Sequence, residues 1–69
     1  MAGRDSEGLP DAERALALAP ANAGVIETRA EIYEKLGKRE KAIADYRQAL
    51  SLEAGMKSAA DGLKRLGAE

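Results

Sequence analysis

The chain has 69 residues, no cysteine and no histidine, and its eleven basic and twelve acidic residues leave a net charge of −1. A core of this size supplies only about 3 to 5 kcal/mol of net stability, and without cysteine neither disulfides nor thiolate metal sites can add to it. Charges of both signs are interspersed, which argues against a nucleic-acid-binding surface or an anionic-membrane surface. We therefore expect a single domain spanning residues 1–69.

The sequence contains no recognisable targeting signal. No apolar run approaches the roughly 18 residues of a spanning helix, and the N-terminal stretch "MAGRDSEG" lacks the apolar core of a signal peptide. We expect a soluble protein with no membrane partner. The cytoplasm is favoured, and the periplasm stays open because an upstream signal could have been removed.

The apolar residues are those of helices: Leu, Ile and Ala dominate, and β-branched residues are scarce. We therefore predict an all-α fold. Pro20 ends the first predicted helix, because a proline disfavours helical geometry in the residue before it. Its start is expected near Leu9, since Pro10 fits only a first turn. Its apolar positions recur at spacings of three and four: Leu9, Ala12, Leu16 and Ala19.

Two further amphipathic helices follow in the middle of the chain. Residues 24–36 form one, with a C-terminal stop at Gly37. After the spacer Lys38-Arg39, the next helix repeats the same spacing. The apolar positions of the two helices are Ile26, Ala30 and Tyr33 in the first and Ala42, Ile43, Tyr46, Ala49 and Leu50 in the second.

A fourth helix is predicted after Gly55 and ends at Gly67. Short links between consecutive helices favour antiparallel neighbours. The chain should therefore be an antiparallel array of about four helices. The apolar positions of the last one are Met56, Ala59, Ala60, Leu63 and Leu66.

An internal repeat relates the first helix to the third. Asp11 recurs as Asp45, at an offset of 34 residues. A fixed period in this range is typical of stacked helical repeats. Three apolar residues recur at the same offset: Ala15 and Ala49, Leu16 and Leu50, and Leu18 and Leu52.

With this pattern the chain resembles the tetratricopeptide repeat family, whose unit is a 34-residue helix-turn-helix. The resemblance covers Ala23 to Met56 as one complete repeat (residues 23–56), and its most specific stretch is "YEKLGKREKAIADYRQALSL". Aromatic, turn and small residues stand where the family places them: Tyr33, Gly37, Ala42, Tyr46, Ala49 and Leu50.

The flanking segments complete this interpretation. Residues 7–22 resemble the second helix of an upstream repeat, with Pro20 at the family's proline, and residues 57–67 resemble the first helix of a following repeat or a C-terminal capping helix. Three positions depart from the family: Ile26 replaces a bulky aromatic residue, Arg29 a leucine and Ala54 a second proline. Arg29 also occurs in bacterial variants of the repeat, so we expect a bacterial-type repeat within an α-solenoid fragment.

Packing arguments agree with the resemblance. Two helices approach closely only where side chains are small, so Ala30 and Ala42 should form the crossing, with both tyrosines in the core rather than stacked on bases. An array normally needs at least about three repeats. The chain is therefore expected to be a segment of a longer protein or a module completed by association.

Catalytic chemistry is not expected. Histidine and cysteine supply the commonest bases, nucleophiles and transition-metal ligands, and both are absent. Glu27, Glu31 and Glu34 share one helix face, but the partner carboxylates and histidines of a bundle metal site are missing. We predict no catalytic residue, no metal and no cofactor. For these glutamates, a solvated acidic face is the commoner interpretation, and ligand recognition is the other.

The resemblance implies a non-enzymatic protein-interaction scaffold, a superhelix that binds a peptide or partner segment on its concave face. On that mapping the concave face carries Gly24, Glu27, Glu31, Glu34 and Lys35. Such an acidic stripe favours a basic peptide, disfavours RNA and is unsuited to gripping the terminal carboxylate of a chaperone. The alternative is a purely structural terminal cap or self-association unit, with a homodimer formed through the exposed terminal helices.

Overall fold

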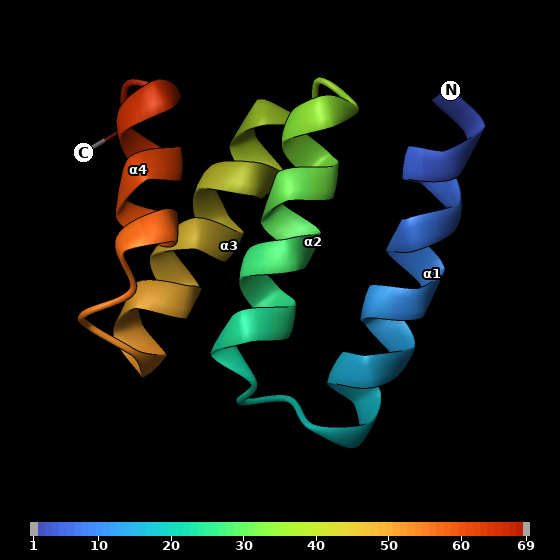
Figure 1. Ribbon diagram of the computed structural model, residues 1–69, viewed down its shortest axis with the longest axis horizontal. Coiled ribbons are helices and arrows are strands. Elements are labelled where there is room, and N and C mark those ends of the chain that lie inside the picture. The colour runs from blue at the N-terminus through green and yellow to red at the C-terminus, as the bar shows by residue number, and fades with distance from the viewer. Residues whose placement is uncertain (1, 69) are drawn as a thin grey trace.

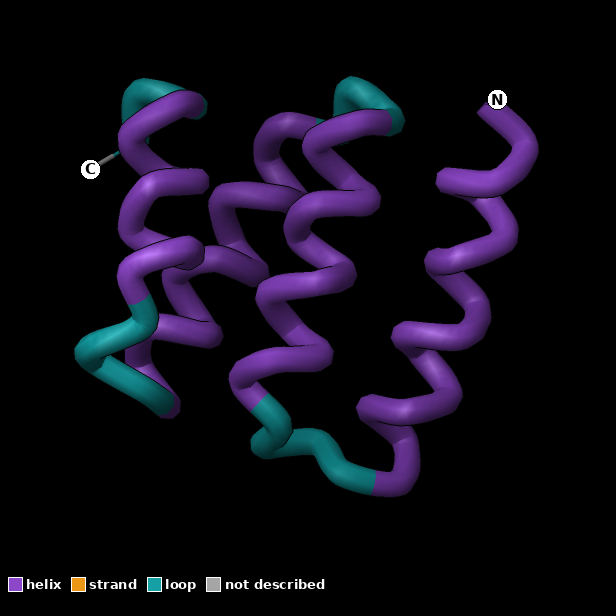
Figure 2. Tube along the Cα trace, in the orientation of Figure 1, coloured by secondary structure: helices purple, strands orange, loops and turns teal. Residues whose placement is uncertain are grey.

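The computed structural model describes residues 2–68, and their side chains from residue 8 onward. Within that range the chain folds into four helices joined by short links (Figures 1 and 2). Neighbouring helices are antiparallel, and α3 lies behind α2 and α4 while α1 stands on the far side of α2. The predicted all-α architecture is confirmed. The helices are α1 (Ala2–Leu18), α2 (Ala23–Lys35), α3 (Arg39–Leu52) and α4 (Lys57–Arg65).

Helix α1 is longer than predicted. It begins at Ala2 and holds Pro10 in its interior, so the predicted start near Leu9 was wrong. A proline inside a helix removes one backbone hydrogen bond and crowds the preceding turn, but helical residues on both sides can keep the helix continuous through it. The predicted end is confirmed, because α1 stops at Leu18, just ahead of Pro20.

The ends of α2 and α4 use the residues that favour a helix boundary. The side-chain oxygen of Asn22 accepts a hydrogen bond of 3.1 Å from the Val25 amide at the start of α2. Gly37 and Gly67 adopt positive φ angles of 78° and 71° just after α2 and α4. In this conformation the Lys38 amide donates to the Tyr33 carbonyl at 2.8 Å, which closes the helix end.

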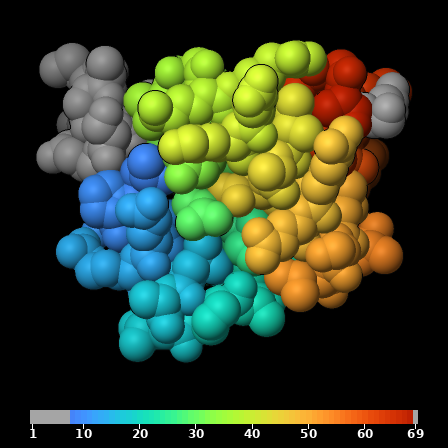
Figure 3. Space-filling model, turned by 180° about the vertical axis from the view of Figure 1, so that it is seen from behind, coloured from blue at the N-terminus to red at the C-terminus, as the bar shows by residue number. Residues whose placement is uncertain are grey.

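The core lies between α2 and α3. Ala30 and Ala42 are both fully buried, as expected for the predicted close crossing. Tyr46 and Ile26 are the largest fully buried side chains, so the tyrosine assignment to the core is confirmed for Tyr46 and, at 9% exposure, for Tyr33. On the reverse side of the molecule α3 lies between α1 and the last helix (Figure 3).

Helix α4 packs on α3 through its small residues. Ala59 and Gly62 are buried, and a Cβ atom added to Gly62 would lie 2.6 Å from Cε1 of Tyr46. Only glycine permits an approach this close. Leu63 completes the contact with 6% exposure. None of the helices within residues 2–68 has the length and apolar character needed to cross a membrane.

Candidate interaction face

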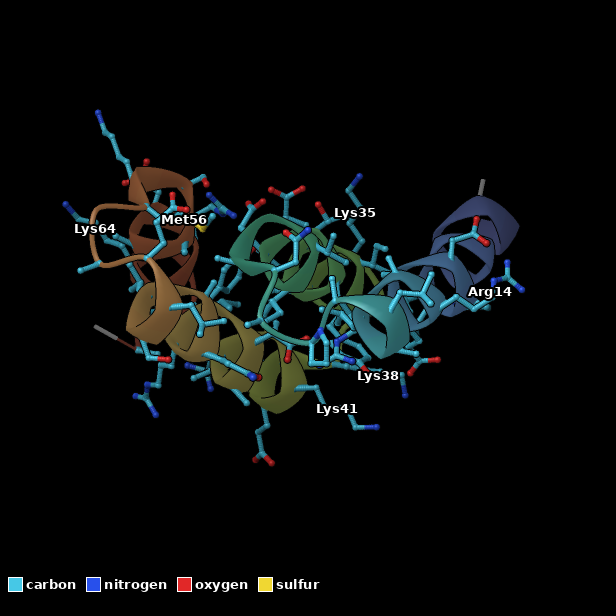
Figure 4. All side chains as sticks on the ribbon, turned by 90° about the horizontal axis from the view of Figure 1, so that it is seen from below. Arg14, Lys35, Lys38, Lys41, Met56 and Lys64 are labelled. Atoms are coloured by element: carbon cyan, nitrogen blue, oxygen red, sulfur yellow. The ribbon has the colours of Figure 1, made fainter. Side chains whose placement is uncertain are left out.

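The side of α2 and α4 that points away from α3, here called the inner face, carries the predicted site residues of α2. Figure 4 shows Lys35 on this side, whereas Lys41 of α3 points to the opposite side. Gly24, Glu31 and Lys35 are exposed, and Glu27 and Glu34 are half-buried. Helical spacing therefore brings the residues onto one stripe, but it leaves them in different environments.

Glu34 is held by side chains from two other helices. Its Oε1 accepts a hydrogen bond of 2.7 Å from the Tyr46 hydroxyl, and its two oxygens accept bonds of 3.1 and 3.0 Å from Arg65. The Arg65 guanidinium and the Tyr46 hydroxyl lower the pKa of Glu34. Burial, and then the hydrogen bond to Glu34, raise the pKa of Tyr46. This network joins α2, α3 and α4 and neutralises one end of the acidic stripe.

Glu27 lies in a different electrostatic environment. Its Oε2 atom is buried and has no hydrogen-bond partner among the described residues. Burial, followed by the neighbouring carboxylate of Glu31, raises the pKa of Glu27 to about 7, and Ser58 and Arg65 oppose this shift only in part. Near neutral pH, the Glu27 carboxyl group is therefore protonated in only part of the molecules. The charge of Glu27 therefore changes with pH in the neutral range.

A shallow hollow of about 420 Å³ opens on the inner face. Its lining comes from α2 and α4 and mixes both charge signs: Glu31, Glu34, Lys35 and Arg65. Sequence reasoning placed the three α2 residues on the inner face but missed Arg65, because the pairing of residues 31 positions apart depends on where α4 packs. A second hollow, of about 450 Å³, lies at the turn between α2 and α3 and contains none of the predicted site residues.

Arg29 of α2 forms an ion pair with Asp45 of α3. Its Nε and Nη2 atoms donate to the two carboxylate oxygens of Asp45 at 2.7 and 2.9 Å, and the Asp45 side chain is 7% exposed. This bidentate pair is geometrically strong. The Arg29 guanidinium also lies 5.8 Å from the centre of the Tyr33 ring. Arg29, which replaces the family's leucine, is therefore paired with a buried aspartate on α3.

Residues 23–55 match the family model of the tetratricopeptide repeat. The matched residues span helices α2 and α3, and a tetratricopeptide repeat is a unit that generally mediates protein–protein interaction. No curated protein and no solved structure matches the chain. The match gives the class of module, while the partner, the residues that contact it and a bacterial type of repeat stay predictions.

Proposed function

We propose that this chain is a non-enzymatic interaction module that binds a peptide or partner segment on the inner face of α2 and α4. The proposal rests first on the tetratricopeptide repeat formed by α2 and α3. It rests second on the hollow between α2 and α4, which offers charged groups of both signs. A repeat of this kind typically works as a scaffold and not as an enzyme.

The charges within the inner face favour a partner segment that places one basic side chain beside the middle of α2. Arg65 already pairs with Glu34, whereas Glu31 is exposed and Glu27 has a buried oxygen without a partner among the described residues. The local excess of acid therefore lies at Glu27 and Glu31. Exposed charges steer a partner more than they hold it, so affinity should be modest and should fall as salt is raised.

The test compares two pairs of charge-removing variants. A basic peptide and its acidic counterpart of equal length are titrated against the chain, the Glu27→Gln/Glu31→Gln variant and a matched control, Glu40→Gln/Glu53→Gln, whose sites are exposed on α3 and just after it. We expect the first variant to lose about fivefold in affinity for the basic peptide and the control to lose less than twofold. Unchanged, salt-insensitive binding by the first variant would place recognition elsewhere.

The alternative function, a terminal cap or self-association unit, is favoured by the ends of the molecule. Lys57, Asp61 and Lys64 of α4 are exposed and polar, as a capping helix requires. Leu18 of α1 is 89% exposed, and apolar side chains of this kind favour association. Light scattering over a wide concentration range distinguishes the two: a homodimer supports self-association, and a monomer that binds the basic peptide supports the scaffold.

A further inference from the structure

The surroundings of Glu27 do little to support a negative charge on its carboxyl group. Its Oε2 atom is buried and has no hydrogen-bond partner among the described residues. The next carboxyl group on the same side of α2 belongs to Glu31, one helical turn away. A buried oxygen without a donor disfavours ionisation, and so does a second acid beside it. The geometry therefore favours the neutral form of Glu27 more than it is favoured in an ordinary glutamate.

Glu34, on the same stripe of α2, is in the opposite situation. Its oxygens accept hydrogen bonds from Arg65 and from the Tyr46 hydroxyl, and these bonds lower its pKa. Arg65 is thus engaged with Glu34, and it opposes the raised pKa of Glu27 only in part. Two carboxyl groups about two turns apart on one helix therefore differ near neutral pH: Glu34 is charged, and Glu27 is partly neutral.

The absence of histidine and cysteine makes Glu27 stand out further. These two residue types have ordinary pKa values of about 6.5 and 8.5 and normally supply the side chains that titrate near neutral pH. This sequence contains neither. Burial, followed by the carboxylate of Glu31, raises the pKa of Glu27 to about 7. Among the described residues, a titration between pH 6 and pH 8 is therefore assigned to Glu27.

A basic side chain that binds beside the middle of α2 would favour the ionised form of Glu27 in two ways. Its positive charge attracts the Glu27 carboxylate directly. By pairing with the exposed Glu31, it also removes the repulsion that Glu31 exerts on Glu27. Neither effect requires contact with the buried Oε2 atom, because opposite charges shift a pKa from about 4 to 6 Å away.

We propose that the binding of a basic partner segment to the inner face releases a proton from Glu27 to solution, so that affinity rises with pH across the neutral range. This inference rests on the proposed function and adds its regulation. The sign follows from linkage: the bound state holds fewer protons than the free state, so a rise in pH favours it. At low pH the segment must displace the proton, and at high pH the carboxylate is already ionised.

The probe is a blocked peptide of alternating arginine and serine, which has no group of its own that titrates near pH 7. It is titrated into the whole chain in a calorimeter at pH 6 and pH 8, at constant ionic strength. We expect about fivefold higher affinity at pH 8, the result of a pKa about one unit lower in the bound state. At pH 6.5, buffers of different ionisation enthalpy should show about half a proton released per peptide.

Two variants assign the released proton. Glu27→Gln cannot ionise, so it should bind the peptide at both pH values about as weakly as the unaltered chain does at pH 6, without proton release. Glu40→Gln, at an exposed site on α3, should keep both the pH dependence and the proton release. A Glu27→Gln variant that keeps the fivefold change between pH 6 and pH 8 would overturn the assignment.

Nuclear magnetic resonance separates a failure of this inference from a failure of the proposed function. The carboxyl carbon of Glu27 is followed against pH in the chain without peptide, and we expect a midpoint near 7. A midpoint near the ordinary 4.5, or equal peptide affinity at pH 6 and pH 8, would overturn the proton release and leave the scaffold standing. An absence of peptide binding at every pH would overturn the proposed function, and the linked proton release with it.

Discussion

The two ends of the molecule each contain a glycine against a large side chain, and they use it differently. At the C-terminal end, a Cβ added to Gly62 would lie 2.6 Å from the buried ring of Tyr46. At the N-terminal end, a Cβ added to Gly8 would lie 3.1 Å from Cδ1 of Ile32, the far end of a flexible side chain. A rigid, buried ring cannot yield, whereas an isoleucine tip can. The fit is therefore strict at α4 and tolerant at α1.

Polar contacts sharpen this difference. The C-terminal end is fixed by Arg65, which binds Glu34 and the Tyr46 hydroxyl, and by Arg39 and Arg47, which donate to the carbonyls of Leu66 and Ala68. The described part of α1, from residue 8 onward, shows an ion pair only within the helix, between Asp11 and Arg14. Helix α4 is thus positioned by directional contacts, and α1 by apolar contact with α2.

The largest effect is expected from Gly62→Ala. The new methyl group would overlap the Tyr46 ring and force α4 away from α3, at a net loss of about 2 to 3 kcal/mol of unfolding free energy after the better helix propensity of alanine is included. Thermal denaturation measures the loss. Gly55→Ala, in the link between α3 and α4, is the control for the added methyl group alone, because a Cβ at Gly55 would meet nothing within 4 Å. Equal melting temperatures for Gly62→Ala and the unaltered chain would refute the strict fit at α4.

The second-largest effect is expected where α2 packs against α3, between the two ends of the molecule. Ala42 is fully buried at its crossing with α2, so Ala42→Leu should overpack the core and lower the free energy of unfolding by about 2 kcal/mol. Ala44→Leu, on the exposed side of the same helix, should leave it nearly unchanged. In Ala42→Leu, hydrogen exchange should show that the backbone amides of α1 and α4 lose protection to the same extent. Destabilisation confined to one end would show that the ends do not depend equally on this crossing.

Much of this architecture was predictable because it follows from local patterns. Gly37 and Gly67 favour positive φ, and the 34-residue offset between Asp11 and Asp45 indicates a stacked repeat. The start of α1 was missed because the rule for Pro10 describes an average preference, which a longer helix can override.

The candidate site was less predictable for a different reason. Helical spacing places Glu27, Glu31 and Glu34 on one stripe, but it says nothing about what stands opposite. The pairing of Glu34 with Arg65, and the burial of Glu27, follow from the position of α4, which depends on the close approach of Gly62 to Tyr46. The charge of the inner face is therefore a tertiary property, absent from the spacing alone.

Glu27 gives a smaller, pH-dependent effect at the C-terminal end. Its pKa is raised to about 7 in the folded chain, so the folded state binds this proton more tightly than the unfolded state does. Its contribution to stability is fully present below the ordinary pKa of about 4.5 and is lost as pH rises through about 7. Groups facing it set the size of this loss: Glu31 on the same helix, and Ser58 and Arg65 on α4.

Glu27→Gln should remove that pH dependence. We expect the variant to be more stable than the unaltered chain by about 1 kcal/mol at pH 8, a value discounted for solvent screening, and to match it near pH 4. Urea denaturation at several pH values measures the difference. Glu53→Gln, at an exposed site beyond α3, serves as the control. A difference between Glu27→Gln and the unaltered chain that does not change with pH would contradict the assigned role of this carboxyl group.

The smallest effect is expected at the N-terminal end, from Gly8→Ala. The added methyl group would press on Cδ1 of Ile32 at 3.1 Å, a contact that a small rotation of the isoleucine relieves. Gly8 lies within α1, where alanine is favoured over glycine by about 1 kcal/mol, and the two terms should cancel to within about 0.5 kcal/mol. Thermal denaturation of Gly8→Ala and Gly62→Ala compares how strictly the two ends are packed. Both variants gain the same methyl group and the same helix propensity. A loss as large as that of Gly62→Ala would mean that α1 is held as strictly as α4, and Ile32→Val in the Gly8→Ala background would then be expected to restore stability.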